Sequence, residues 1–141
     1  MVYRRFGQDI VVRLDRGEEL VEAIEQVCQK ENVKLAEVSG LGGCDYAELG
    51  FYDLAAQEYS TNTLEEALEL IHLGGNITQM DGAYRHHLHA SFGDSQGRAY
   101  GGHLLKTRIA LTAEIFIRVI DGLVDRQHDE VLGIDLLQFK D

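Results

Sequence analysis

The spacing of apolar residues allows this chain one clear helix and many strands. Helical spacing is clearest between residues 20 and 28, where the apolar steps of one, three, three and one place five side chains on one helix face: Leu20, Val21, Ile24, Val27 and Cys28. Asp15 and Glu18 precede this face with the spacing of a capping box, and Asn32 follows it as a stop. We therefore predict a helix that begins after Asp15 and ends before Asn32.

Segments typical of strands fill most of the remaining chain. They run over residues 2–6, 9–14, 33–41, 46–52, 58–62, 85–92, 98–106, 114–120 and 133–139. Residues 64–73 are ambiguous, because they contain strong helix formers although Leu68 and Leu70 also fit an alternation. Many strands with one clear helix predict an α+β domain built on a mostly antiparallel sheet.

Length and composition fit one globular domain over residues 1–141. Apolar residues make up 45% of the 141 residues and charged residues 26%, which argues against a disordered chain. There is no proline, so glycine, asparagine and aspartate must form the turns. Two cysteines are too few for a disulfide framework, so we expect reduced thiols, with Cys28 in the core and the role of Cys44 open.

The charge of the chain bears on its partners and its location. The formal net charge is −11, and such a surface repels phosphate backbones and anionic lipid headgroups. No segment resembles a signal peptide, and no apolar stretch approaches the ~18 residues of a membrane span. We therefore expect a cytoplasmic protein without a membrane partner.

Three histidines in neighbouring strand segments form the most informative pattern. In a strand, His87 and His89 lie on one face and Leu88 and Ala90 on the other, which we take as the core face. His86 shares the parity of the core face, so it is not counted as a ligand. Residues 93–97 have turn chemistry and lead to a second strand segment that contains Gly101, Gly102 and His103.

The register of this hairpin decides whether the histidines meet. With Ser95 at the centre of the turn, His87 lies opposite His103, and His89 opposite Gly101. A slip of one residue would move His103 to the other face. Three imidazoles on one face suit a zinc ion with an open position, although Ni, Cu and Fe accept the same ligands. We predict a metal site formed by His87, His89 and His103.

The same segments resemble a known family, the plants-and-prokaryotes conserved (PPC) domain, in its short bacterial and archaeal form. The matching stretches are residues 14–20, 38–42, 49–53, 69–77, 87–90, 93–94 and 101–104. The resemblance implies an antiparallel sheet flanked by helices, assembly as a homotrimer, and a strand over residues 69–77. It also implies zinc binding at His87, His89 and His103, which plant members have lost. His72 stands where the family more often has a small hydroxyl residue.

Three functions remain open from the sequence. The first is a metal-dependent enzyme or small-molecule binder, in which Glu69 and Glu114 are acid–base candidates and Arg98 and Arg108 are candidate anchors for a substrate carboxylate. For these four side chains, and for the isolated His72 and His128, ordinary exposed positions are the favoured interpretation.

The other two functions are DNA binding and protein interaction. Family members are often labelled DNA-binding, and plant members carry a separate AT-hook with an Arg-Gly-Arg-Pro core. This chain has no proline and lacks the basic footprint of a duplex binder. In the interaction module, the trimer would be the function and the metal structural. Ligand spacing does not separate a structural metal from a catalytic one.

Overall fold

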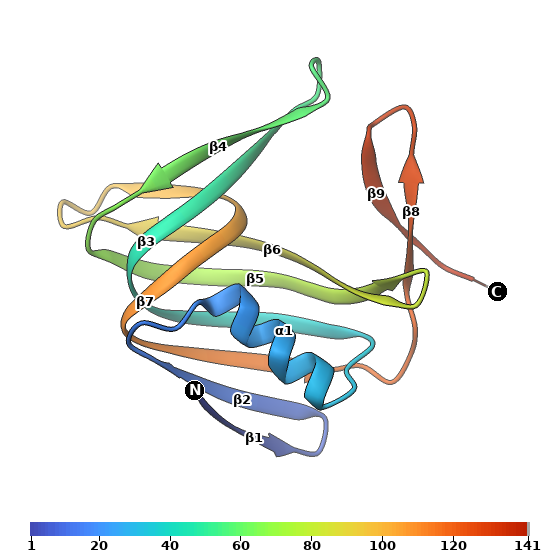
Figure 1. The fold of residues 1–141 in the computed structure, drawn as a ribbon, viewed down its shortest axis with the longest axis horizontal. Helices are drawn as coiled ribbons and strands as arrows, with labels where there is room; N and C mark the ends of the chain where they lie inside the picture. The colour runs from blue at the N-terminus through green and yellow to red at the C-terminus, as the bar shows by residue number, and fades with distance from the viewer. Residues whose placement is uncertain (141) are drawn as a thin grey trace.

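The computed structural model describes residues 1–140, which form nine strands and one helix (Figure 1). In chain order these are β1 (Val2–Phe6), β2 (Asp9–Asp15), α1 (Leu20–Lys30), β3 (Ala36–Asp53), β4 (Glu58–Leu64), β5 (Leu68–Met80), β6 (Ala83–Gly93), β7 (Ala99–Val119), β8 (Asp125–Asp129) and β9 (Ile134–Gln138).

The main sheet is antiparallel and has seven strands in the order β1-β2-β7-β6-β5-β3-β4. Strand β7 also pairs with β3, so β3, β5, β6 and β7 form a closed circuit of pairings. The predicted antiparallel sheet is confirmed. The expectation of several flanking helices is wrong, because residues 1–140 contain one helix, which lies across one face of the sheet (Figure 1).

Two strands are longer than predicted. Residues 36–53 form one strand with bulges, where Gly40, Gly42 and Gly43 had indicated a break, and residues 99–119 form another. The glycines allow close packing, since a Cβ on Gly42 would lie 2.7 Å from the carbonyl oxygen of Thr112. A glycine cluster that admits a neighbouring backbone has the same local sequence signature as a turn.

Helix α1 supplies the apolar layer above the sheet. Its buried face matches the predicted one, and Asn32 ends it in a left-handed conformation with φ of 53°. The predicted cap is wrong, because Glu19 accepts hydrogen bonds from the backbone N–H groups of Val21 and Glu22. In residues 1–140 no helix is both long and apolar enough to cross a bilayer.

Strand β5 shows tertiary pairing prevailing over local propensity. Residues 68–80 are extended, as the family resemblance implied, although their glutamates and leucines favour a helix. Pairing with β3 on one side and β6 on the other satisfies the backbone of this strand.

The β8–β9 hairpin stands apart from the main sheet and contacts the β3–β4 hairpin. The Tyr52 hydroxyl donates to the carbonyl of Leu132 at 2.5 Å, and the Gln57 amide donates to that of Val131 at 2.6 Å. Both acceptors lie in the turn between β8 and β9. Strand β9 was predicted, whereas β8 was not, because residues 125–129 are polar throughout.

Candidate metal centre

Strand β6 positions two of the three histidines. Leu88 is fully buried and Ala90 is 6% exposed, so this face of the strand lies in the core as predicted. His87 and His89 therefore point away from the core, on the exposed face. The neighbouring strand β5 packs so closely against β6 that a Cβ on Gly75 would lie 2.0 Å from the carbonyl oxygen of His87.

The third histidine comes from β7, in a register two residues away from the predicted one. His89 pairs with His103, and Gly93 pairs with Ala99. The turn thus spans residues 94–98, and the predicted pairing of His87 with His103 is wrong. A shift of two residues keeps the parity, so all three histidines still share a face.

The side chain of Asp94 sets this register. Its carboxylate accepts hydrogen bonds from the backbone N–H groups of Gln96 and Arg98 at 2.9 and 3.0 Å, and from Arg98 Nε at 2.6 Å. These bonds hold the pKa of Asp94 at about 2, although burial acts in the opposite direction. An aspartate that caps its own turn moves the loop centre one residue beyond Ser95.

The three imidazoles converge on a common point. One ring nitrogen from each of His87, His89 and His103 lies within 4.8 Å of the other two. The Nε2 atoms of His87 and His89 are 3.1 Å apart. Two nitrogens bound to a tetrahedral zinc ion would be about 3.3 Å apart, given Zn–N bonds near 2.0–2.1 Å. The donor set therefore fits a zinc-sized ion, and metal binding itself stays a prediction.

Electrostatics keep two of these rings in the form that binds metal. Burial, together with the charges of His87, His89 and His86, lowers the pKa of His103 to about 4. Burial also lowers the pKa of His87, together with the nearby charges of His89 and Arg126. Near pH 7 both rings are therefore neutral. His103 Nδ1 is buried and has no hydrogen-bond partner among the described residues, so no protein group competes for it.

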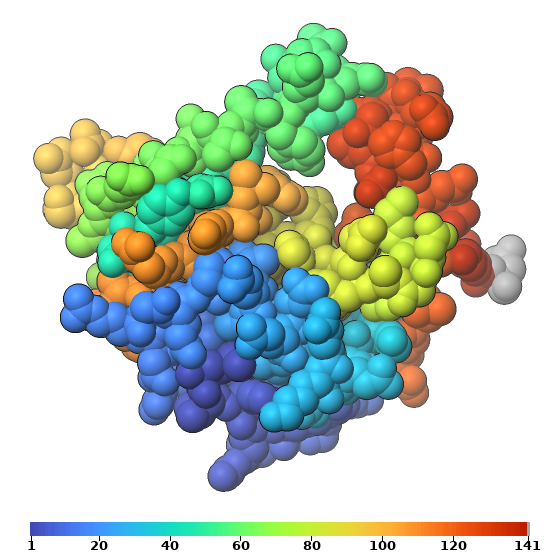
Figure 2. Space-filling model, in the orientation of Figure 1, coloured from blue at the N-terminus to red at the C-terminus, as the bar shows by residue number. Residues whose placement is uncertain are grey.

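A cavity of about 340 Å³ opens beside the histidines. Its lining comes from five parts of the chain: Tyr59 on β4, residues 85–87 on β6, His103 on β7, Arg126 and His128 on β8, and residues 133–135. Figure 2 shows a hollow between the tip of the β3–β4 hairpin and the β8–β9 hairpin. The volume suits a small organic molecule.

The other sequence candidates lie elsewhere. Arg98 pairs with Asp94 at 2.6 Å, and Arg108 pairs with Asp45 at 2.7 Å. Neither Glu69 nor Glu114 lines the cavity or belongs to the histidine cluster.

The two isolated histidines differ from each other. His72 is exposed on β5, as favoured. His128 also makes an ordinary polar contact, to Asp135 at 2.9 Å, but it lines the cavity.

Sequence reasoning missed the cationic residues of the cavity. Arg85 and Arg126 both line it. Arg126 stands in the polar run 125–129, where no apolar alternation indicates a strand, so nothing local placed it near the histidines. Only the β8–β9 fold brings it there.

Comparison with known proteins adds a family match. The family model described as the Plants and Prokaryotes Conserved (PCC) domain matches residues 1–121. A metal-containing protein from Archaeoglobus fulgidus is 31% identical, with 99% of each chain covered and a TM-score of 0.88. A plant- and prokaryote-conserved protein from Pyrococcus horikoshii is 29% identical, covering 99% of this chain and 96% of that one, with a TM-score of 0.86.

Two further relatives carry other descriptions. A protein from Bacteroides thetaiotaomicron, described as a candidate DNA-binding protein, is 25% identical, with 98% and 96% of the two chains covered and a TM-score of 0.95. The bifunctional protein GlmU of a Synechococcus strain is 32% identical over an alignment of 125 residues that covers 86% of this chain. The chain spans 19% of the length of that relative.

Proposed function

This chain belongs to the Plants and Prokaryotes Conserved domain family, and we propose that it binds one divalent transition-metal ion, zinc first, through His87, His89 and His103. The observation that carries the proposal is the convergence of three ring nitrogens within 4.8 Å. The metal-containing relative from Archaeoglobus fulgidus supports it.

We propose that the ion serves a small-molecule enzyme or binder. Three neutral imidazoles leave the charge of a zinc ion uncompensated, and such an ion can polarise a carbonyl or lower the pKa of bound water. The cavity gives a small molecule access to the histidine cluster, because His87 and His103 belong to the cluster and also line the cavity. A purely structural site would instead be closed by a fourth protein ligand, and no cysteine or carboxylate of residues 1–140 joins the three histidines.

We also propose assembly as a homotrimer, which the family resemblance implies. An exposed apolar face supports it. Phe116 and Leu41 are 51% and 53% exposed. Phe116 alternates along β7 with the buried Ile115 and Ile117, and Leu41 pairs with Glu114, two residues from Phe116, so both side chains lie on the face of the sheet away from the core. Leu111, which precedes Phe116 in β7, is 72% exposed. Exposed apolar surface of this kind marks protein interfaces.

DNA binding is the second candidate, favoured by the description of the Bacteroides relative. The net charge of −11 opposes it, because contacts to phosphates dominate protein–DNA affinity. We expect no gel shift of duplex DNA at micromolar protein in low salt. A shift that weakens as salt rises would restore this function.

Metal content tests the main proposal. The full chain, purified, loaded with zinc and dialysed, should retain about one ion per chain by plasma mass spectrometry. His89→Ala should retain almost none, because two imidazoles hold zinc weakly. His72→Ala is the matched control, since it removes an exposed histidine outside the cluster. Wild type that takes up no zinc, or His89→Ala with unchanged content, would refute the metal site.

A further inference from the structure

We propose, on the premise of the metal site above, that the cavity binds a small molecule with a carboxylate at one end, which Arg126 holds while the other end faces the histidines. The anchor is therefore Arg126, and neither Arg98 nor Arg108 has this role, because both are paired with aspartates outside the cavity.

The guanidinium of Arg126 is fixed in place by neutral acceptors. Nε donates to Thr78 Oγ1 at 2.8 Å, Nη2 to Asn76 Oδ1 at 2.8 Å, and Nη1 to the carbonyl of Asp135 at 3.1 Å. A guanidinium has five N–H donors, so one remains on each terminal nitrogen. A guanidinium can present one N–H from each terminal nitrogen side by side to the two oxygens of a carboxylate.

The charge of Arg126 has no carboxylate partner within residues 1–140. The carboxylate of Asp135 is bound to His128 at 2.9 Å, and only its backbone carbonyl contacts Arg126. Arg85 on the same cavity wall has a single hydrogen bond, to the carbonyl of Tyr84. The cavity is thus lined by two guanidinium groups, those of Arg85 and Arg126, and by one carboxylate, that of Asp135, which is already paired with His128. Although the chain has a net charge of −11, this part of its surface attracts an anion.

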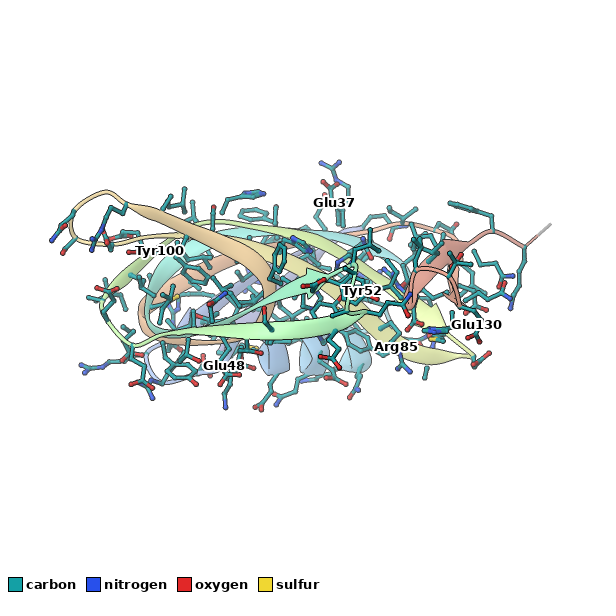
Figure 3. All side chains as sticks on the ribbon, turned by 90° about the horizontal axis from the view of Figure 1, so that it is seen from above. Glu37, Glu48, Tyr52, Arg85, Tyr100 and Glu130 are labelled. Carbon is teal, nitrogen blue, oxygen red and sulfur yellow. The ribbon has the colours of Figure 1, made fainter. Side chains whose placement is uncertain are left out.

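The sheet register places this anchor one strand away from the metal ligands. Asn76, which holds Arg126, lies directly opposite His87, and Thr78 lies opposite Arg85. Opposed residues share a face, and neighbouring strands are about 4.8 Å apart. A molecule of a few carbon atoms therefore spans the guanidinium and the histidines. Arg85 lies toward the end of the molecule where the β8–β9 hairpin stands (Figure 3).

Calorimetric titration of the zinc-loaded full chain with succinate and butyrate tests the anchor. Both probes have four carbons and one carboxylate for the metal end, and only succinate has a second carboxylate for Arg126. Wild type should bind succinate about tenfold or more tighter than butyrate, the effect of a charge-assisted bidentate pair. Arg126→Gln should abolish this preference. Arg126→Lys should retain part of it, because lysine keeps the positive charge and lacks the paired N–H donors of a guanidinium.

Arg118→Gln is the matched control, since it removes the same charge from an exposed position on β7 outside the cavity. It should keep the preference. Should Arg126→Gln fail to fold, the wild-type comparison and Arg126→Lys still decide. Equal affinities for the two probes in zinc-loaded wild type would overturn this inference alone. A chain that takes up no zinc would overturn the metal site and the anchor together.

Discussion

At the scale of single residues, burial decides the charge of the candidate ligands. His103 is half-buried on β7, next to Gly50 of β3 and the ring of Tyr59. Its lowered pKa, about 4, is a consequence of that position and not of the imidazole itself. The folded chain therefore presents a neutral ring at a pH where an unfolded chain is already partly protonated.

This pKa shift predicts how the stability of the metal-free protein depends on pH. Between about pH 6.5 and pH 4 the unfolded chain binds a proton at His103 that the folded chain does not, so stability falls as pH falls through this range. Above pH 6.5 the contribution of His103 is fully present. Thermal melts of metal-free wild type at pH 7, 5.5 and 4.5 measure the slope.

His103→Gln is the control for this prediction, because it leaves the carboxylates unchanged. Its melting temperature should fall less steeply between pH 6.5 and 4.5, by several degrees in total. Parallel curves for the two proteins would show that His103 titrates alike in both states and would contradict the pKa shift.

At the scale of elements, the turn between β6 and β7 brings the ligands together. Asp94 accepts from Gln96 and Arg98 and so fixes the pairing of His89 with His103. A turn one residue longer or shorter would leave His103 on the other face of the sheet. The same carboxylate also accepts a hydrogen bond from the hydroxyl of Tyr100, the second residue of β7, at 3.3 Å.

Removing the Asp94 carboxylate should therefore weaken metal binding from a distance. We expect Asp94→Ala to lower zinc affinity about 10–100-fold, the usual effect of losing a group that orients ligands, and to lower the melting temperature. Competition with a zinc-sensitive dye measures the affinity.

Asp53→Ala is the control for the turn. Asp53 likewise accepts from backbone N–H groups, those of Ala55 and Ala56, but in the β3–β4 hairpin. The Asp53→Ala variant should keep the zinc affinity of the wild type. Equal losses in the two variants would show that turn stability in general, and not the β6–β7 register, governs the site.

At the scale of the whole molecule, the sheet has one covered face and one open face. Ile115 and Ile117 are fully buried in the core, while Phe116 between them is 51% exposed. Strand alternation thus produces a second apolar surface that the monomer does not bury.

A charge on the open face should dissociate the proposed trimer. Wild type should have a mass of three chains of 15.8 kDa by light scattering, and Phe116→Glu should have the mass of one chain. Val131→Glu is the control, because Val131 is 81% exposed at the turn between β8 and β9. A monomeric wild type, or a trimeric Phe116→Glu, would contradict this assembly.

Local sequence determined the helix face, the alternation of β6 and the three candidate ligands. Period 3.6 places Leu20, Ile24 and Val27 together, and period 2 separates His87 and His89 from Leu88, whatever the rest of the chain does. Parity also survived the error in the hairpin register, because that error was two residues.

Only the tertiary structure decided the extent of β3 and β7, the strand at β5 and the cationic wall of the cavity. Gly40, Gly42 and Gly43 fit a turn and close strand packing equally well in the local sequence. The packing with β7, some seventy residues away, decides for the strand. Arg126 reaches the histidines through Asn76 and Thr78, fifty residues distant in sequence. Such contacts depend on how β5, β6 and β8 meet in space, which residue spacing along the chain does not encode.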